Sequence, residues 1–342
     1  MKAVALRAAS EARRRARSTR AALAGAPVVI GPTGPPAPEP PAVERLPVWP
    51  SPQQAAEAPF VYARFPPGHY YSPLPDTREL AQEPRRSQIW PETPRETPGI
   101  DWRDAEQVAL CRDVFGRQPR LELAEAPTSD PAEYFMSNDQ FSPLDAWLLE
   151  AFLRHLRPRR MIEIGSGYST LVSARVNREL LDGSMHLTCI EPYPRSFLAD
   201  GVPGVSELRV EQVQDTPLEI FGALGENDVL FIDTSHVAKT GSDVTWLYQE
   251  VVPRLSLGVV VHIHDVFAPG EYPQSWVLDG WGWNELYVVR AFLAFNSAFR
   301  IELGAQYMLQ RHAELMREAF PGLAVERLAK PGGGSLWIRR AP

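Results

Sequence analysis

Apolar and polar positions follow two different rhythms along the chain. Between residues 142 and 156 apolar side chains recur at helical spacing, with Ser142 as a cap and Pro143 in the first turn. Beyond this predicted helix, short apolar runs alternate with amphipathic stretches. The runs predict strands at 161–164, 187–190, 208–210, 229–232 and 259–263. The amphipathic stretches predict helices near 168–182, 192–199, 217–224, 241–254 and 284–297.

Strands that alternate with helices are typical of a parallel sheet with helices on both faces. Two further strands are predicted at 299–303 and 336–339, on either side of a helix at 308–319. The fold class that follows is α/β, a Rossmann-like three-layer sandwich with an N-terminal extension.

The stretch before this domain divides into two parts. Residues 1–58 read as a basic tail and a Pro-rich linker, which we expect to be disordered because the proline-dense run 31–41 suits neither a helix nor a central strand. Residues 59–134 are expected to form an N-terminal extension or cap, with an ordered loop at 66–73 and a helix at 101–115. The sheet domain would then span 135–342.

Composition excludes several classes of protein. The net charge of −7 over 342 residues argues against a general nucleic-acid binder. The chain has no run of about 18 uncharged apolar residues, so we expect no membrane span. Its two cysteines, Cys111 and Cys189, do not make a disulfide framework and favour a reducing, cytoplasmic setting. The Arg-rich first 20 residues lack the apolar core of a secretory signal, and a solvated basic tail is favoured over a transit peptide.

A glycine turn follows the first predicted strand, in the segment Glu163-Ile164-Gly165-Ser166-Gly167. Glycines there permit a sharp turn and a close approach by a ligand, and the amides of the next helix offer donors to a carboxylate. Glu191 ends the second strand, where a carboxylate can accept hydrogen bonds from the hydroxyls of a ribose. We therefore predict a nucleoside-containing cofactor, with Glu163 either on the cofactor side or bracing the loop.

Two absences narrow the choice of cofactor. Thr170 stands where the usual dinucleotide fingerprint has its third glycine, which counts against NAD. No Gly-Lys-Ser/Thr follows the turn, which counts against a phosphate-binding loop of the nucleotide triphosphatases.

Three segments together resemble a known family: the glycine turn with Glu191, the run Asp228-Val229-Leu230-Phe231-Ile232-Asp233, and the run Gly258-Val259-Val260-Val261-His262-Ile263-His264-Asp265. In this order they are similar to the class I S-adenosylmethionine-dependent methyltransferases, in the branch called methyltransferase family 24. The resemblance covers roughly residues 135–342. It implies a seven-stranded sheet of order 3-2-1-4-5-7-6, with the seventh strand antiparallel.

The resemblance also implies roles for single residues. Gly165 and Gly167 would face the methionine part of S-adenosylmethionine, Glu191 the ribose, and Gln214 with Asp215 the adenine. Related leader regions suggest that Tyr134, Asn138 and Phe141 cover the cofactor. The expected cofactor-binding set is Glu163, Gly165, Ser166, Gly167, Ser169, Glu191, Gln214, Asp215 and Asp233.

Polar side chains gather after the fourth and fifth strands, where ligands bind in open α/β sheets. Asp233 and His236 follow one strand, and His264 and Asp265 end the next. We predict these four as the catalytic residues, with His236 ahead of His264 as the base that removes a proton from an acceptor hydroxyl. His262 is assigned to the core, on the opposite side of the sheet from His264.

A divalent metal is the alternative reading of the same cluster, with Asp233, His264 and Asp265 as ligands. Catechol-type methyltransferases and cephalosporin hydroxylase-like proteins resemble this layout, with acids that hold magnesium. Here His264 stands where an acid would be, and imidazole suits other ions better, so magnesium is not favoured.

A long aromatic loop, residues 266–285, follows the cluster and contains Trp276, Trp281 and Trp283. Its position predicts a substrate lid, and its composition equally predicts a hydrophobic plug that packs on helices. Both interpretations stay open at this point.

The function predicted from these features is methyl transfer from S-adenosylmethionine to a hydroxyl of a small molecule or sugar. A metal-dependent hydroxylase of the cephalosporin type is the first alternative, and a cofactor-binding module without activity is the second. The expected partner is a small-molecule acceptor rather than a nucleic acid. The acceptor, the choice between O-, N- and C-methylation and the oligomeric state stay open.

Overall fold

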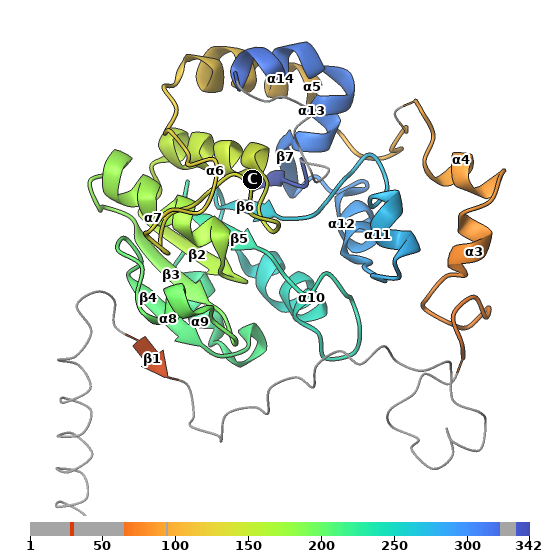
Figure 1. Cartoon of the computed structure of the whole chain (residues 1–342), viewed down its shortest axis with the longest axis horizontal. Helices are drawn as coiled ribbons and strands as arrows, with labels where there is room; N and C mark the ends of the chain where they lie inside the picture. The colour runs from red at the N-terminus through yellow and green to blue at the C-terminus, as the bar shows by residue number, and fades with distance from the viewer. Residues whose placement is uncertain (1–27, 31–64, 94, 322–332) are drawn as a thin grey trace, which may run out of the picture.

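A single mixed sheet organises the chain, as the computed structural model shows (Figure 1). The structure describes residues 28–30, 65–93, 95–321 and 333–342. The predicted disordered tail, residues 1–58, lies outside the described residues apart from one short strand.

The sheet has eight strands in the order β1-β4-β3-β2-β5-β6-β8-β7. Without β1 this is the predicted order 3-2-1-4-5-7-6, and β8 runs antiparallel to both of its neighbours, so the predicted topology is confirmed. The strands are β1 (Val28–Ile30), β2 (Arg160–Ile164), β3 (His186–Ile190), β4 (Glu207–Val210), β5 (Val229–Ile232), β6 (Val260–Ile263), β7 (Phe299–Gly304) and β8 (Leu336–Arg340).

Strand β1 was not predicted from the sequence. It pairs with β4 in parallel, with Val28 opposite Leu208, and adds an eighth strand at the edge of the sheet. Its three residues stand between Pro27 and a proline-rich stretch, and so short an apolar run does not indicate a strand.

The predicted helices agree with the structure within a few residues, and three short helices at 77–80, 85–89 and 274–278 were not predicted. The structure has α3 (Thr77–Leu80), α4 (Arg85–Ile89), α5 (Asp104–Ala109), α6 (Pro143–Leu156), α7 (Tyr168–Leu180), α8 (Ser196–Ala199), α9 (Leu218–Gly222), α10 (Asp243–Trp246), α11 (Gln274–Leu278), α12 (Glu285–Leu293), α13 (Ala305–Arg311) and α14 (Ala313–Ala319). Tighter or wider helical turns extend two of them: η1 (Leu110–Val114) and η2 (Phe115–Arg117) follow α5, and η4 (Leu247–Val251) and η5 (Val252–Arg254) follow α10. The short turn η3 (Val213–Asp215) follows β4.

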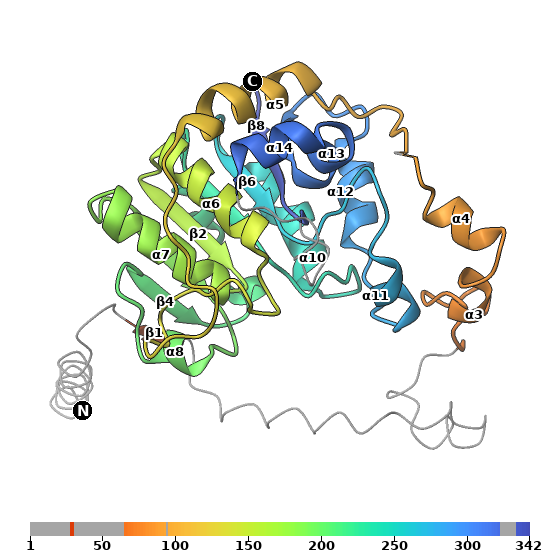
Figure 2. The ribbon, with the colours of Figure 1, turned by 45° about the horizontal axis from the view of Figure 1, so that its top comes forward.

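The helices cover the sheet from both sides. Figure 2 shows α6 and α7 in front of the strands and α10 behind them. Ser142 caps α6 as predicted, with its hydroxyl accepting a hydrogen bond from the Asp145 amide at 3.3 Å. Every residue of β5 and β6 is buried, because a parallel strand with helices on both faces has no solvent side. Among the described residues no helix is long and apolar enough to cross a membrane.

The segment before the sheet joins the same hydrophobic core. Trp102 stacks on Tyr307 of α13 with ring centroids 4.5 Å apart. Gln107 of α5 accepts a hydrogen bond from the Gly304 amide at 2.8 Å. The helix predicted at 308–319 is divided into α13 and α14 at His312, whose imidazole binds the Asp104 carboxylate at 2.6 Å. Residues 101–117 therefore pack as part of the sheet domain.

The register of the parallel strands aligns four strand ends in one row. The last residues of these strands lie opposite one another: Ile164, Ile190, Ile232 and Ile263. The residues that follow them are Gly165, Glu191, Asp233 and His264. This row brings four of the predicted site residues to one edge of the sheet.

Candidate active site

Gly165 stands in the tightest part of the glycine turn. Its φ is +76°, in the left-handed region that favours glycine, and a Cβ built there would lie 1.8 Å from the carbonyl oxygen of Asp233. The Asp233 amide also donates to the Ile164 carbonyl at 2.9 Å, so the two strand ends are in direct contact. Only a residue without a side chain fits between them.

Gly167 is a glycine for a different reason. Its φ of −163° is extended backbone that any residue adopts, and a Cβ there would meet no protein atom within 4 Å. The residue starts α7 and faces open space in a cavity. Packing within the protein does not require a glycine here, whereas close approach of a ligand to the backbone does.

Glu163 lies beneath this turn and is fully buried. Its Oε1 accepts hydrogen bonds from Ser169 at 2.5 Å and from Thr170 at 3.0 Å, and the Thr170 hydroxyl in turn accepts from the Gly167 amide at 3.0 Å. Burial outweighs these hydrogen bonds and raises the pKa of Glu163 to about 8. Two roles were predicted for Glu163, and these contacts match the second, in which it braces the loop.

Two cavities open beside the row of strand ends. Cavity A, of about 500 Å³, is lined by the glycine turn and by the polar groups after β5 and β6. Cavity B, of about 650 Å³, lies toward β4 and is lined by Gln212, Gln214 and Lys239 among others. Glu191 and Asp233 line both cavities, so the two spaces adjoin.

The cavities bring together most of the predicted cofactor residues. Those that line cavity A are Gly165, Ser166, Gly167, Ser169, Glu191 and Asp233. Gln214 lines cavity B, whereas Glu163 and Asp215 line neither cavity. The side chain of Glu191 is held in place by a hydrogen bond, which its Oε1 accepts from the Tyr193 amide at 2.8 Å. Burial raises the pKa of Glu191 above its usual range.

His236 sits at the centre of the polar cluster after β5. Its Nδ1 lies 2.9 Å from Oε2 of Glu285, and its Nε2 lies 3.2 Å from Oδ1 of Asp233 and 3.8 Å from Oδ2 of Asp265. A neutral imidazole has one N–H and serves only one of two flanking carboxylates, whereas the imidazolium serves both. Burial opposes the charged form, but the hydrogen bonds to Asp233 and Glu285 outweigh it and hold the pKa of His236 well above its ordinary value.

Glu285 was not predicted as a site residue. It is buried at the first position of α12 and, besides His236, accepts hydrogen bonds from the Thr234 hydroxyl at 2.6 Å and the Tyr248 hydroxyl at 3.1 Å. Its one signal in the sequence is an acid in the first turn of a helix, which the helix dipole explains by itself. Only the contact with His236 reveals its place in the cluster.

Two residues of this cluster also carry backbone strain. His236 and Asp265 have φ values of +57° and +53°, in the left-handed region that residues other than glycine rarely adopt. Such strain persists only where the surroundings hold it, and it is typical of functional sites. Both residues line cavity A.

The prediction that His262 and His264 face opposite sides of the sheet is wrong. Their rings stack with centroids 5.7 Å apart, because residues two apart in a strand point to the same face. His262 is a core residue as predicted: it is fully buried, its Nε2 lies 3.0 Å from the Ser335 hydroxyl, and burial lowers its pKa well below the usual range. His264 sits closer to the strand end and lines cavity A.

The alternative metal site does not assemble in the part of the chain that the structure describes. No three His, Cys, Asp or Glu side chains come together there in a way that suits a metal ion. Within the predicted ligand set, the shortest contact between His264 and Asp265 joins Nε2 to Oδ1 at 3.6 Å.

The aromatic loop contributes both to the core and to the wall of cavity A. Phe267 and Ala268 are buried in the core, as a plug would be. Trp276, Trp281 and Trp283 line cavity A, and the ring of Trp283 lies 4.2 Å from the ring of His236. The loop thus anchors itself in the core and presents a wall of tryptophans to the cavity.

Of the leader residues, one forms another part of the wall of cavity A. Phe141 lines cavity A, and its ring lies 5.0 Å from that of His264. Tyr134 is buried and donates a hydrogen bond to the Phe141 carbonyl at 2.8 Å, while Asn138 accepts one from the Phe141 amide at 2.7 Å. Tyr134 and Asn138 hold Phe141 in place rather than lining the cavity themselves.

Comparison with known proteins agrees with this site. The profile of a methyltransferase domain, family 24, matches residues 162–266, from the strand before the glycine turn to the residue after Asp265. The chain belongs to this family of class I methyltransferases. A relative described as an uncharacterized protein of Archaeoglobus fulgidus is 35% identical over 167 residues, which cover 48% of this chain and 75% of the relative.

This methyltransferase is also similar to solved structures. One is the O-methyltransferase TomG of Streptomyces achromogenes, in complex with SAM, with 17% identity over 71% of this chain and 92% of that chain and a TM-score of 0.35. Another is an O-methyltransferase of Bacillus cereus in complex with SAH, with 20% identity over 48% of this chain and 76% of that chain and a TM-score of 0.33.

Proposed function

We propose that this chain transfers a methyl group from S-adenosylmethionine to a hydroxyl group of a small-molecule acceptor. The observation that carries the proposal is the composition of cavity A. One wall is a glycine turn with room for a ligand against the backbone at Gly167, and the other is an imidazole between carboxylates at His236. A cofactor site and a proton-accepting site therefore share one space.

The residues present suit S-adenosylmethionine. The open space at Gly167 and the amides at the start of α7 fit its carboxylate end, and Glu191 at the end of β3 fits the ribose hydroxyls. Cavity B, with Gln214 in its wall, has room for the adenine. When bound, S-adenosylmethionine supplies a methyl group on a good leaving group, so no protein nucleophile is needed.

The chain's own part in the chemistry would be to position the acceptor and take up its proton. Nε2 of His236 is the atom proposed to receive the hydroxyl proton, because Nδ1 is engaged by Glu285. In the resting cluster the raised pKa favours the imidazolium form of His236, between Asp233 and Glu285. Nε2 must therefore lose its proton before His236 can act as a base. We infer that activity increases as the pH rises toward the pKa of His236.

Calorimetric titration with S-adenosylhomocysteine tests the proposal directly. The wild-type chain should bind it in a one-to-one complex, and Glu191→Ala should weaken binding at least tenfold because the ribose hydroxyls lose their acceptor. Wild-type protein that does not bind S-adenosylhomocysteine, or that forms none of it from S-adenosylmethionine with any hydroxylated acceptor of a broad panel, contradicts the proposal.

A further inference from the structure

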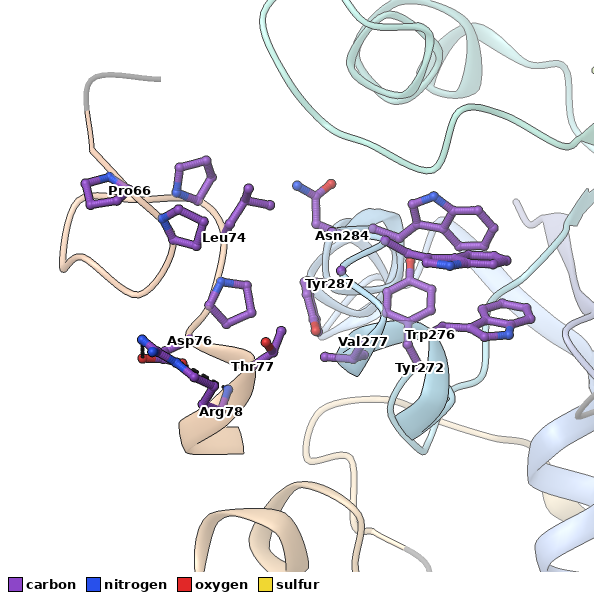
Figure 3. Close-up of a pocket in the computed structure, with 17 residues that line it drawn as sticks. Pro66, Leu74, Asp76, Thr77, Arg78, Tyr272, Trp276, Val277, Asn284 and Tyr287 are labelled. Atoms are coloured by element: carbon purple, nitrogen blue, oxygen red, sulfur yellow. Dashed lines mark hydrogen bonds and ion pairs between the residues drawn. The ribbon is translucent and has the colours of Figure 1, made fainter. Parts of the chain in front are cut away.

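A third cavity lies beside the wall of tryptophans. Cavity C, of about 710 Å³, shares Trp276, Trp281 and Trp283 with cavity A. Figure 3 shows Trp276 and Tyr272 on one side of the space and Leu74 on the other. Residues 66–78 of the N-terminal extension supply this second wall, so the cavity exists only because the extension lies against the aromatic loop.

Flat aromatic surfaces dominate the lining of cavity C. Trp276 stacks on Trp281 with centroids 4.6 Å apart and an interplanar angle of 14°. Trp283 meets Trp281 at 4.7 Å and the edge of Tyr272 at 6.1 Å. Such an array favours a planar apolar guest, because offset-stacked and edge-to-face contacts add to the gain from burial.

The charged and amide side chains of the lining and the Tyr287 hydroxyl are already engaged with one another or with neighbours. Arg78 binds Asp76 at 3.2 Å and stays largely in solvent. Asn284 accepts a hydrogen bond from the Ala238 amide at 2.6 Å, and the Tyr287 hydroxyl donates to Glu271 at 2.9 Å. A phosphate would lose its water here without gaining a free cation, since Arg78 is paired with Asp76, and this loss is costly. An uncharged aromatic guest meets no such cost.

We propose that cavity C binds the aromatic body of the methyl acceptor, whose hydroxyl reaches into cavity A past Trp283. This inference rests on the proposed function and adds the class of substrate, an uncharged aryl alcohol or phenol. Trp283 stands between the two spaces, since it lines both, and its ring lies 4.2 Å from that of His236. The volume of cavity C lies within the roughly 300–1,000 Å³ of small-molecule sites.

Filling the cavity from the N-terminal wall provides the test. Leu74→Trp would occupy space in cavity C from the wall that faces the tryptophans, and it changes no residue of the His236 cluster. Leu257→Trp is the matched control, since Leu257 is 56% exposed and lines none of these cavities. The probes are 2-naphthol and methyl α-glucopyranoside, titrated into the full chain by calorimetry with S-adenosylhomocysteine present.

The expected result is binding of 2-naphthol to the wild type and to Leu257→Trp with equal affinity, and at least tenfold weaker binding to Leu74→Trp. S-adenosylhomocysteine should bind all three proteins within twofold, which also reports folding. If Leu74→Trp does not fold, Thr77→Trp from the same wall replaces it.

The possible failures point to different conclusions. Wild-type protein that does not bind S-adenosylhomocysteine contradicts the proposed function itself. When S-adenosylhomocysteine binds, three results overturn the assignment of cavity C: no binding of 2-naphthol, equal binding to Leu74→Trp and Leu257→Trp, or tighter binding of the glucoside than of 2-naphthol.

Discussion

Oε2 of Glu285 lies 2.9 Å from Nδ1 of His236, although the two residues are 49 positions apart in the sequence. The contact joins the start of α12 to the loop after β5 and leaves Nε2 of His236 facing Asp233. Because Glu285 is buried, its charge acts on His236 with little screening by water. Glu285 is therefore a positioning residue for the proposed base.

Replacing Glu285 by Gln tests this relationship. We expect Glu285→Gln to lower kcat on the order of 10²-fold, within the range of general acid–base catalysis. The loss of the carboxylate should also lower the pKa of His236, because Glu285 is one of the groups that raise it. The rising limb of the pH–rate profile would then move to lower pH. A merely structural role would lower the rate and leave this limb in place.

The control for this variant is Glu314→Gln, at a side chain that is 85% exposed. It should leave kcat and the pH profile unchanged. An unmoved profile in Glu285→Gln, together with unimpaired S-adenosylhomocysteine binding, would remove Glu285 from the proposed mechanism.

Substitution of His236 separates binding from turnover. His236→Ala should bind S-adenosylhomocysteine within about twofold of the wild type, yet lower kcat by roughly 10²–10⁴-fold because the proton acceptor is gone. Calorimetry and the rate of S-adenosylhomocysteine release measure the two effects. His186→Ala, at an exposed histidine that starts β3, is the matched control. Retained turnover in His236→Ala would exclude His236 as the base.

The two glycines of the cofactor turn should respond differently to the same substitution. Gly165→Ala places a Cβ 1.8 Å from the Asp233 carbonyl at a φ of +76°, so we expect unfolding to become easier by about 2–4 kcal/mol. Gly183→Ala is the control, because its φ of +68° carries the same backbone strain without a collision. It should cost only about 1 kcal/mol. Denaturant unfolding measures both, and equal losses would disprove the collision.

Gly167→Ala tests the room for the cofactor rather than the fold. A Cβ there meets no protein atom within 4 Å, so the free energy of unfolding should change by less than about 1 kcal/mol. The methyl group would nevertheless occupy space in cavity A, and S-adenosylhomocysteine should bind about tenfold more weakly. Unchanged affinity would show that the ligand does not approach this backbone.

Glu163 predicts a pH dependence of stability. Its pKa rises from 4.5 to about 8 on folding, so between these values the unfolded chain releases a proton that the folded chain keeps. Folding thus loses stability from this group as the pH rises from 4.5 to 8. Glu163→Gln keeps an acceptor for Ser169 and Thr170 without an ionisable group. Its stability relative to the wild type should therefore increase from pH 5 to pH 8.

Thermal unfolding of both proteins across this pH range measures the difference. Glu314→Gln again serves as the control, and its melting temperature should follow that of the wild type at every pH. Parallel curves for Glu163→Gln and the wild type would mean that Glu163 is already ionised in the folded chain.

Local patterns were enough to predict most of the secondary structure and the cofactor turn. The central strands β5 and β6 follow from short apolar runs, since strands that are buried on both faces are largely apolar. Gly165 and Glu191 follow from their positions at the ends of such runs. Strand β1 was not predicted, because its three residues pair with β4, a partner far along the chain.

The sequence by itself determined which residues form the strands and which polar residues follow them, because apolar periodicity and strand ends are local properties of the chain. Only the tertiary structure decided which contacts those polar residues make. It buried Glu163 under the glycine turn as a brace, placed Glu285 against His236, and set the N-terminal extension opposite the tryptophans. These contacts join segments whose separation along the chain carries no pattern, so only the packing of the fold reveals them.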